Sequence, residues 1–357
     1  MRSLTYLCAL FALLVGSLAH AGGYKAWPVS TGTVSNAHLV RTMPGQLVVQ
    51  GEQNQKLYYA FGRDGGRSWN EATLDPPFDA RGNAFPRSVG ATPYFQLLGG
   101  WILDADTRPT DMPVWYYRFP LWRPTTLAAT PADTFRRREV NSMAWGDTEG
   151  RCCYAFGAED YPGYHARIWK STDYGLSWAP LPNLNLDGHR TATVRTVTSG
   201  RVVWGNTDSQ LVCIPPDGPP RLMWYPEAHR KLLALCAPNE TLVTIVILDL
   251  LRPDPQTYVY ASRDGGANWR GTKSFAEGAT AADFIVPDVG VVAFQDTAPV
   301  FAARLLCTRD GWKTSVTDRI ENGEVRDIKV VSDKEIYLLV QNRASGKLYY
   351  ARWEPDW

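Results

Sequence analysis

The sequence predicts an all-β fold made of repeated four-stranded sheets, and three observations lead to this prediction. A turn-like motif recurs along the chain, its copies are separated by multiples of one approximate length, and short β-rich runs bounded by Gly, Pro, Asp and Asn fill the intervals. No stretch shows sustained helical periodicity. Repetition on this scale predicts one ring or array of similar units, where the length of 357 residues alone would suggest two ordinary domains.

The recurring motif has the residue types of a tight turn between two strands. Its copies read GRDGGRSW at 62–69, STDYGLSW at 171–178 and SRDGGANW at 262–269, with a degenerate copy, TRDGW, at 308–312. The Asp side chain can accept hydrogen bonds from nearby backbone N–H groups, Gly supplies positive φ, and Trp enters the next strand and packs beneath the turn. We therefore expect structural roles, and neither catalysis nor calcium binding, for Asp64, Trp69, Asp173, Trp178, Asp264, Trp269 and Asp310.

The spacing of the motif gives the number of units. The aspartates at positions 64, 173, 264 and 310 are 109, 91 and 46 residues apart. These intervals correspond to two, two and one units of about 49 residues, which is near the length of a four-stranded propeller blade. The chain that follows residue 21 is long enough for about seven such units. The sequence thus predicts a β-propeller of seven four-stranded blades, with six blades as the alternative.

Seven triplets of strand-like runs occur in order along the chain. The first runs, expected to be innermost, are Ala37–Thr42, Pro86–Ala91, Asn141–Trp145, Thr193–Thr198, Lys231–Ala237, Asp283–Pro287 and Val325–Ser332. The second runs are Gln46–Gln50, Tyr94–Ile102, Arg151–Gly157, Arg201–Gly205, Thr241–Leu248, Val289–Gln295 and Glu335–Gln341. The third runs are Lys56–Gly62, Val114–Phe119, Ala166–Ser171, Gln210–Ile214, Thr257–Ser262, Phe301–Thr308 and Lys347–Trp353.

The two ends of the chain are expected to share one blade. Six units have a fourth strand after the turn, such as Ser68–Thr73 or Ser177–Leu181, but the last unit ends at Trp357 without one. The N-terminal run Tyr24–Val29 resembles a fourth strand, with Trp27 in the place of Trp69. We expect this run to complete the final blade and close the ring, because closure removes exposed sheet edges.

The motif resembles the Asp-box, or bacterial neuraminidase repeat, whose pattern is Ser-x-Asp-x-Gly-x-Ser/Thr-Trp. The resemblance covers essentially the whole chain after residue 21 and implies a sialidase-like propeller, a class that includes glycoside hydrolases and non-catalytic binding or assembly proteins. A sialidase site would need three arginines, a Tyr nucleophile paired with Glu, and an acid/base Asp. The family's first arginine precedes the first box, where the nearest match is Arg41 in Val40–Pro44. Arg195 and Arg326 fall in innermost runs, and no Tyr/Glu pair stands out.

Residues 1–21 read as a secretory signal peptide, with Arg2, an apolar stretch from Leu4 to Val15 and an Ala19-His20-Ala21 cleavage signal. The remainder, 22–357, is expected to be a single exported propeller domain, periplasmic or extracellular and monomeric. Lys plus Arg number 37 and Asp plus Glu 36, so loss of Arg2 leaves a formally neutral chain. Neutrality argues against nucleic acid as a partner, and the mature chain has no apolar run long enough for membrane insertion.

The cysteines leave a disulfide open. Cys152, Cys153, Cys213, Cys236 and Cys307 follow the signal, so at least one thiol stays unpaired. Cys213 with Cys236 is a plausible bridge between neighbouring strands, and burial of two free thiols is an equal alternative. The spacing of Cys and His residues does not indicate a metal site, and nothing in the sequence indicates a cofactor.

If the chain is a binding propeller, its partner face is formed by the loops that enter the innermost strands and join second strands to third strands. The residues expected there are His38, Arg87, Asn141, Arg190, Arg195, His229, Arg230, Asp283 and Arg326. The sequence thus favours a non-enzymatic scaffold that binds a protein or a glycan. A sialidase-type glycosidase with diverged motifs is the alternative.

Overall fold

The computed structural model describes residues 24–43, 46–54, 56–62, 64–74, 83–87, 95–103, 114–120, 128–131, 138–146, 151–159, 165–173, 177–181, 197–199, 202–207, 210–215, 218–226, 230–251, 253–297 and 301–357. The expected signal peptide, residues 1–21, lies outside the described residues.

The strands of the described residues form seven antiparallel sheets of four strands each. Three sheets comprise β2 (Ser35–Met43), β3 (Gln46–Gln53), β4 (Lys56–Gly62) and β5 (Trp69–Leu74); β6 (Asn83–Arg87), β7 (Phe95–Leu103), β8 (Val114–Pro120) and β9 (Ala128–Pro131); and β10 (Arg138–Trp145), β11 (Cys153–Glu159), β12 (His165–Ser171) and β13 (Ala179–Pro180). Three more comprise β14 (Val197–Ser199), β15 (Val202–Asn206), β16 (Gln210–Ile214) and β17 (Arg221–Trp224); β18 (Lys231–Cys236), β19 (Val243–Asp249), β20 (Gln256–Ser262) and β21 (Arg270–Phe275); and β22 (Ala279–Val286), β23 (Val289–Asp296), β24 (Ala302–Thr308) and β25 (Val316–Glu321). The last contains β26 (Gly323–Ser332), β27 (Glu335–Asn342), β28 (Lys347–Trp353) and β1 (Tyr24–Thr33).

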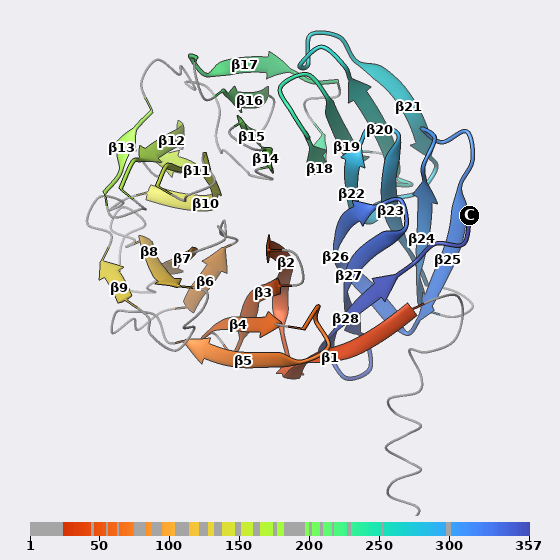
Figure 1. The fold of residues 1–357 in the computed structure, drawn as a ribbon, viewed down its shortest axis with the longest axis horizontal. Coiled ribbons are helices and arrows are strands. Elements are labelled where there is room, and N and C mark those ends of the chain that lie inside the picture. The colour runs from red at the N-terminus through yellow and green to blue at the C-terminus, as the bar shows by residue number, and fades with distance from the viewer. Residues whose placement is uncertain are drawn as a thin grey trace, which may run out of the picture.

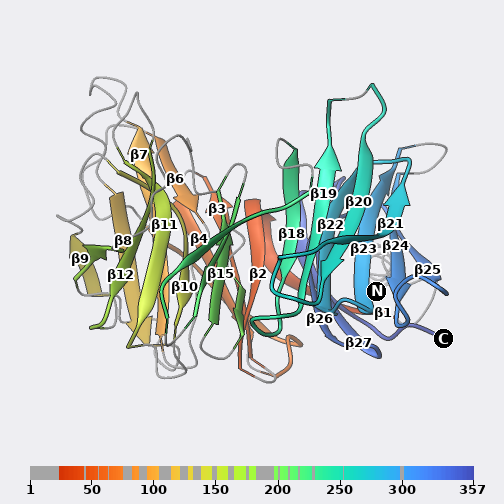
Figure 2. The same cartoon turned by 90° about the horizontal axis from the view of Figure 1, so that it is seen from above.

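These sheets are the blades of a propeller. Figure 1 shows them around a central axis, with the first strand of each sheet nearest the axis. Figure 2 shows the same ring from the side, where the loops gather on two opposite faces. The predicted all-β propeller is therefore confirmed. Strand limits differ from the predicted runs mainly at the inner strands: β6 begins three residues before Pro86, and β22 begins four residues before Asp283.

The burial pattern follows the position of a strand within its blade. Every residue of β19, with the sequence VTIVILD, is buried, because neighbouring blades cover both faces of this second strand. The outer strand β21 exposes most of its residues. Apolar residues of adjacent blades pack against one another: one cluster joins Val246 and Phe275 to Phe284 and Phe294, and another joins Val291 and Leu305 to residues of β26 to β28. The blades thus share their cores.

The first described strand belongs to the sheet that contains the last three. β1 pairs antiparallel with β28, from Tyr24 opposite Trp353 to Thr33 opposite Lys347. The Tyr24 and Trp353 rings stack at 5.9 Å between centroids, and Trp27 stacks on Tyr350 at 5.8 Å. The backbone N–H of Leu348 donates to Ser30 Oγ at 2.9 Å. Residues more than three hundred positions apart are thereby held in one sheet.

The four motif aspartates accept the same hydrogen bonds in their turns. Each carboxylate accepts the backbone N–H of the residue four positions later, at 2.8 Å for Asp64, 2.9 Å for Asp173, 2.8 Å for Asp264 and 2.9 Å for Asp310. Its second oxygen accepts the side chain of that same residue, which is Ser, Ser, Asn or Thr. In the degenerate copy, Thr314 therefore donates both hydrogen bonds to Asp310, although Trp312 stands only two positions after this Asp and not five.

The suggested disulfide between Cys213 and Cys236 is wrong, because both thiols are free. Side chains alternate across a strand, and this places the two cysteines on different faces. Cys213 packs in a cluster with Leu235 and Ala237, whereas Cys236, between those two residues, packs in the opposite cluster with Phe284. There its thiol donates to the carbonyl oxygen of Phe284, and burial raises the pKa of this thiol.

Candidate binding face

One face of the ring collects the loops that enter each first strand and join each second strand to the third. We call it the upper face, and the opposite face, which holds the motif turns, the lower face. In the described residues, the upper face includes 34–36, 51–54, 206–207, 210, 230–231, 249–251, 253–256, 276–278, 295–297, 301–304, 319–324 and 341–347. The connectivity of antiparallel strands fixes this division, because consecutive hairpins must turn at opposite ends.

The β19–β20 hairpin carries two adjacent leucines into solvent on the upper face. Leu250 is 57% exposed and Leu251 is 79% exposed. In Figure 2 this hairpin projects beyond the loops of the neighbouring blade that holds β22 to β25. Large apolar side chains with this exposure are an informative feature of a folded surface, especially when they are adjacent.

The base of this hairpin is held by a buried carboxylate. Asp249, which is fully buried, accepts the backbone N–H of Leu251 at 3.0 Å through Oδ1. Its Oδ2 lies 3.3 Å from Nη2 of Arg230, whose guanidinium lies over the Tyr258 ring at 5.5 Å. The leucines are therefore presented on an ordered backbone.

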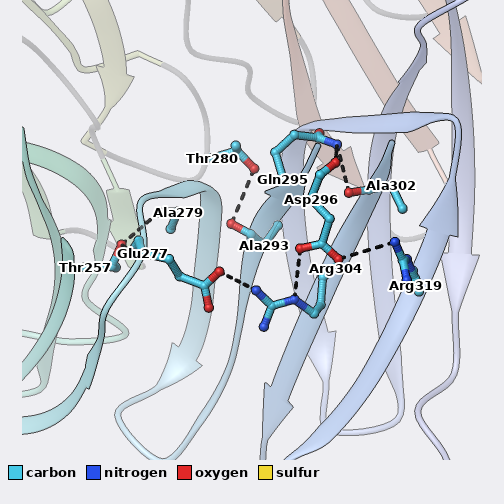
Figure 3. Close-up of polar contacts among 10 residues, drawn as sticks. All are labelled: Thr257, Glu277, Ala279, Thr280, Ala293, Gln295, Asp296, Ala302, Arg304 and Arg319. Carbon is cyan, nitrogen blue, oxygen red and sulfur yellow. Dashed lines mark hydrogen bonds and ion pairs between the residues drawn. The ribbon is translucent and has the colours of Figure 1, made fainter. Parts of the chain in front are cut away.

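A second polar cluster braces the neighbouring blade. Figure 3 shows Arg304 between Glu277, which precedes β22, and Asp296 at the end of β23. Arg304 Nε lies 3.3 Å from Asp296 Oδ1, and Arg319 Nη2 lies 3.6 Å from Asp296 Oδ2. Burial alone would lower the pKa of Arg304, but the two carboxylates outweigh it and raise the pKa. Two acids facing two permanent cations form a charge-balanced brace.

Arg326, one of the candidate clamp arginines, is engaged within its own blade. Its Nη1 lies 2.7 Å from Glu324 Oε1, and its Nε donates to Gln341 Oε1 at 2.8 Å. Gln341 in turn donates to the carbonyl oxygen of Val34 at 2.9 Å, just before β2. Arg326 thus belongs to a network that joins the last blade to the first.

Two inner-strand aspartates link neighbouring blades near the central axis. Asp283 on β22 accepts the backbone N–H of Val330 on β26 at 2.7 Å. Asp327 on β26 accepts the backbone N–H of Leu39 on β2 at 2.8 Å. Asp283, which was expected on the partner face, therefore accepts a hydrogen bond from the next blade.

The other residues named from the sequence are placed as follows. His38 is exposed on β2, near the upper face, and Arg230 forms the hairpin base described above. Arg41 and Asn141 lie on the inner strands β2 and β10. Arg87 is the last residue of the inner strand β6, and therefore lies at its lower-face end, away from the expected partner face. Arg190, Arg195 and His229 lie outside the described residues. The three-arginine clamp therefore stays a prediction.

No group of three or more His, Cys, Asp or Glu side chains in the described part of the chain could hold a metal ion. Among the same residues, no helix is long and apolar enough to cross a membrane.

Comparison with solved structures finds the same fold at low identity. YCF48 bound to D1 peptide matches with a TM-score of 0.59 and 13% identity, over 94% of this chain and 98% of that one. The WD40 domain of Neurospora crassa Pan2 matches with a TM-score of 0.56 and 12% identity, over 90% and 89%. A PL25 ulvan lyase bound to a GlcA-Rha3S saccharide matches with a TM-score of 0.55 and 11% identity, over 92% and 94%. Sialidases are also among the matches, with TM-scores of 0.49 and 0.45.

At these identities the likeness concerns the fold. No protein-family model matches the sequence, and no curated protein matches it.

The sequence contains a signal for the exposed leucines that motif analysis missed. The segment DLLRPDP at 249–255 follows a fully buried strand and carries two prolines, so it predicts a loop, yet it places two leucines in that loop. Asp327 has no such signal, because its acceptor role depends on a backbone N–H from a strand 288 residues away.

Proposed function

We propose that this chain is an exported, single-domain β-propeller, residues 22–357, that binds a protein or glycan partner on its upper face without catalysing a reaction. The observation that carries the proposal is the pair of exposed leucines, Leu250 and Leu251, on a hairpin whose base is fixed. A binding role is in keeping with one neighbour, since YCF48, which is bound to a peptide, shares this fold.

The energetics favour a contact at this hairpin. Complete burial of one exposed Leu side chain stabilises by about 1.5–3 kcal/mol. Given their exposed fractions of 57% and 79%, covering both leucines would contribute about 2–4 kcal/mol. Because the Asp249 bond already orders the backbone, less conformational entropy is lost on binding.

The charges beside the hairpin favour binding over chemistry. Arg230 faces Asp249, and Arg304 faces Glu277 and Asp296, so these side chains balance one another. A general acid or nucleophile would need a group whose pKa or hydrogen bonding is tuned toward a substrate. A balanced brace instead holds a surface in one shape.

The test replaces both leucines and follows a defined complex. Partners are captured from the cell envelope and medium of the source cells, identified, and purified for a direct titration. We expect L250S/L251S to weaken binding by at least about thirtyfold, which corresponds to about 2 kcal/mol. The matched control is Ile285→Ser, which removes a 36% exposed side chain from the end of β22 that adjoins the lower-face β22–β23 connection, and should bind normally. Equal affinity of L250S/L251S and wild type for every purified partner would refute the upper-face contact.

A separate assay addresses the glycosidase alternative. Wild type and Arg41→Ala are incubated with a panel of 4-methylumbelliferyl glycosides, sialosides included. We expect no turnover by either protein. If wild type hydrolyses a sialoside and Arg41→Ala does not, the chain is a sialidase-type glycosidase and the non-enzymatic role is refuted.

A further inference from the structure

The lower face contains a cleft between two neighbouring motif turns, at the opposite end of the strands from the β19–β20 hairpin. Its volume is about 670 Å³, and it lies between the turn at 262–269, the turn at 308–314 and the β22–β23 connection at 287–288. This volume is within the range of small-molecule sites, about 300–1,000 Å³. Four cationic side chains line it: Arg263, Arg270, Arg309 and Lys313.

The acids of the cleft are already engaged. Asp264 and Asp310 each use both carboxylate oxygens on the backbone and side chain of their own turn. Asp288 lies 3.0 Å from Arg263 Nη2. Three of the four cations then remain without an acidic partner in the described part of the chain.

The three remaining cations are well suited to an anion. Arg270, Arg309 and Lys313 take part in no ion pair of the described residues, and the Arg309 guanidinium lies over the Trp357 ring at 4.9 Å. The four cations of the lining outnumber its three aspartates, so the cleft keeps a net positive charge that attracts an anionic ligand. Guanidinium forks and an ammonium group also provide the donors that bind carboxylate and sulfate oxygens most strongly.

The apolar part of the cleft points to a sugar rather than to an acidic peptide. Trp269 lines the cleft, is partly exposed, and is fixed by an Nε1 hydrogen bond to the carbonyl oxygen of Trp224 at 3.3 Å. An indole presents a flat surface on which the C–H face of a sugar ring can pack. The other apolar side chains of the lining are Ala261 and Pro287, too small a set to form the pocket that a peptide's apolar anchor needs.

We propose that this lower-face cleft is a binding site for a short acidic oligosaccharide, one that carries carboxylate or sulfate groups on at least two of its sugars. Arg270, Arg309 and Lys313 contact the acidic groups, and Trp269 supports a sugar ring. The site is separate from the upper face, so a partner on the hairpin and a glycan in the cleft can be bound at the same time.

The test is calorimetric titration of the purified chain in 50 mM salt with a sulfated chondroitin tetrasaccharide. Cellotetraose serves as the neutral sugar and tetraglutamate as the acidic peptide. We expect the sulfated sugar to bind, cellotetraose not to bind, and tetraglutamate to bind at least about tenfold more weakly. Affinity for the sulfated sugar should fall as salt rises to 200 mM, because exposed charges are screened.

The variant R270Q/K313Q should weaken binding of the sulfated sugar by about tenfold or more, since charge-assisted hydrogen bonds are lost. Its matched control is K231Q/K347Q, which removes two exposed cations from the upper face and should bind normally. Both variants alter exposed side chains, so coincident thermal melts confirm that each is folded. L250S/L251S should also retain sugar binding, which separates this result from the fate of the proposed function.

Two outcomes would overturn the proposal. Absence of binding by any acidic probe, or equal loss in R270Q/K313Q and K231Q/K347Q, would remove the site. Tetraglutamate binding as tightly as the sulfated sugar would replace the glycan by an acidic peptide as its ligand.

Discussion

Substitution of Asp327 tests which interactions hold the last blade against the first blade. Its Oδ2 accepts the backbone N–H of Leu39 on β2, and its Oδ1 accepts that of Ile328 at 2.9 Å. Leu39 and Ile328 are buried, so water cannot replace the lost acceptor. Leaving two buried N–H groups unsatisfied costs about 1–3 kcal/mol each, and Asp327→Ala should therefore lower the free energy of unfolding by about 2–6 kcal/mol. Asp327→Asn retains one oxygen acceptor and should lose about half as much.

The assay is urea unfolding followed by tryptophan fluorescence and far-ultraviolet circular dichroism, with the two transitions compared. Asp254→Ala, which removes an exposed carboxylate from the β19–β20 loop, is the control and should stay within about 0.5 kcal/mol of wild type. If Asp327→Ala were as stable as this control, the bond between β26 and β2 would contribute nothing, and the account of blade adhesion would be refuted.

Two further predictions concern the motif turns. Gly65→Ala should destabilise the fold by about 1–2 kcal/mol, because Gly65 has a φ of +68° but a Cβ there would meet no other atom. Gly66→Ala should cost about 2 kcal/mol more, because Gly66 has a φ of +82° and its added Cβ would lie only 2.5 Å from the Tyr350 ring. Equal urea midpoints for the two variants would contradict this prediction. Hydrogen bonds from Asn268 lower the pKa of Asp264 from 3.8 to about 2. A carboxyl group whose pKa is lowered by folding stabilises the folded state at pH values above its unfolded pKa, and this stabilisation is lost as the pH falls through the folded pKa. Wild type should therefore lose stability between about pH 4 and pH 2 more steeply than Asp264→Asn, and parallel stability curves for the two proteins would exclude this contribution.

Much of the fold could be read from the sequence because its signals are local. The turn motif needs only Asp, Gly and a residue four positions after the Asp, and the hydrogen bonds of Asp64 and Asp173 lie within five residues. The strand runs are short and apolar because blades cover both faces of their second strands. The role of Tyr24–Val29 was accessible by counting strands, and the structure extends that strand to Thr33.

The candidate sites were less accessible, because they depend on contacts between distant segments. Arg326 looked like a clamp residue from its inner-strand position, yet Glu324 and Gln341 hold its guanidinium. The lower-face cleft joins residues of two blades, and nothing in the sequence near Arg270 identifies Lys313 as its neighbour.

The repeated β architecture, the aspartate turns and the near-neutral charge could all be predicted from the sequence, since each follows from composition or from spacing along the chain. The packed blades, in contrast, set which charges are neutralised, which face of a strand each cysteine occupies, and where apolar side chains remain exposed. The physical reason is that burial and ion pairing depend on how blades pack around the axis. Asp249 is buried and the next two residues are exposed leucines, and Asp249 has a cationic partner only because the fold brings Arg230 beside the hairpin.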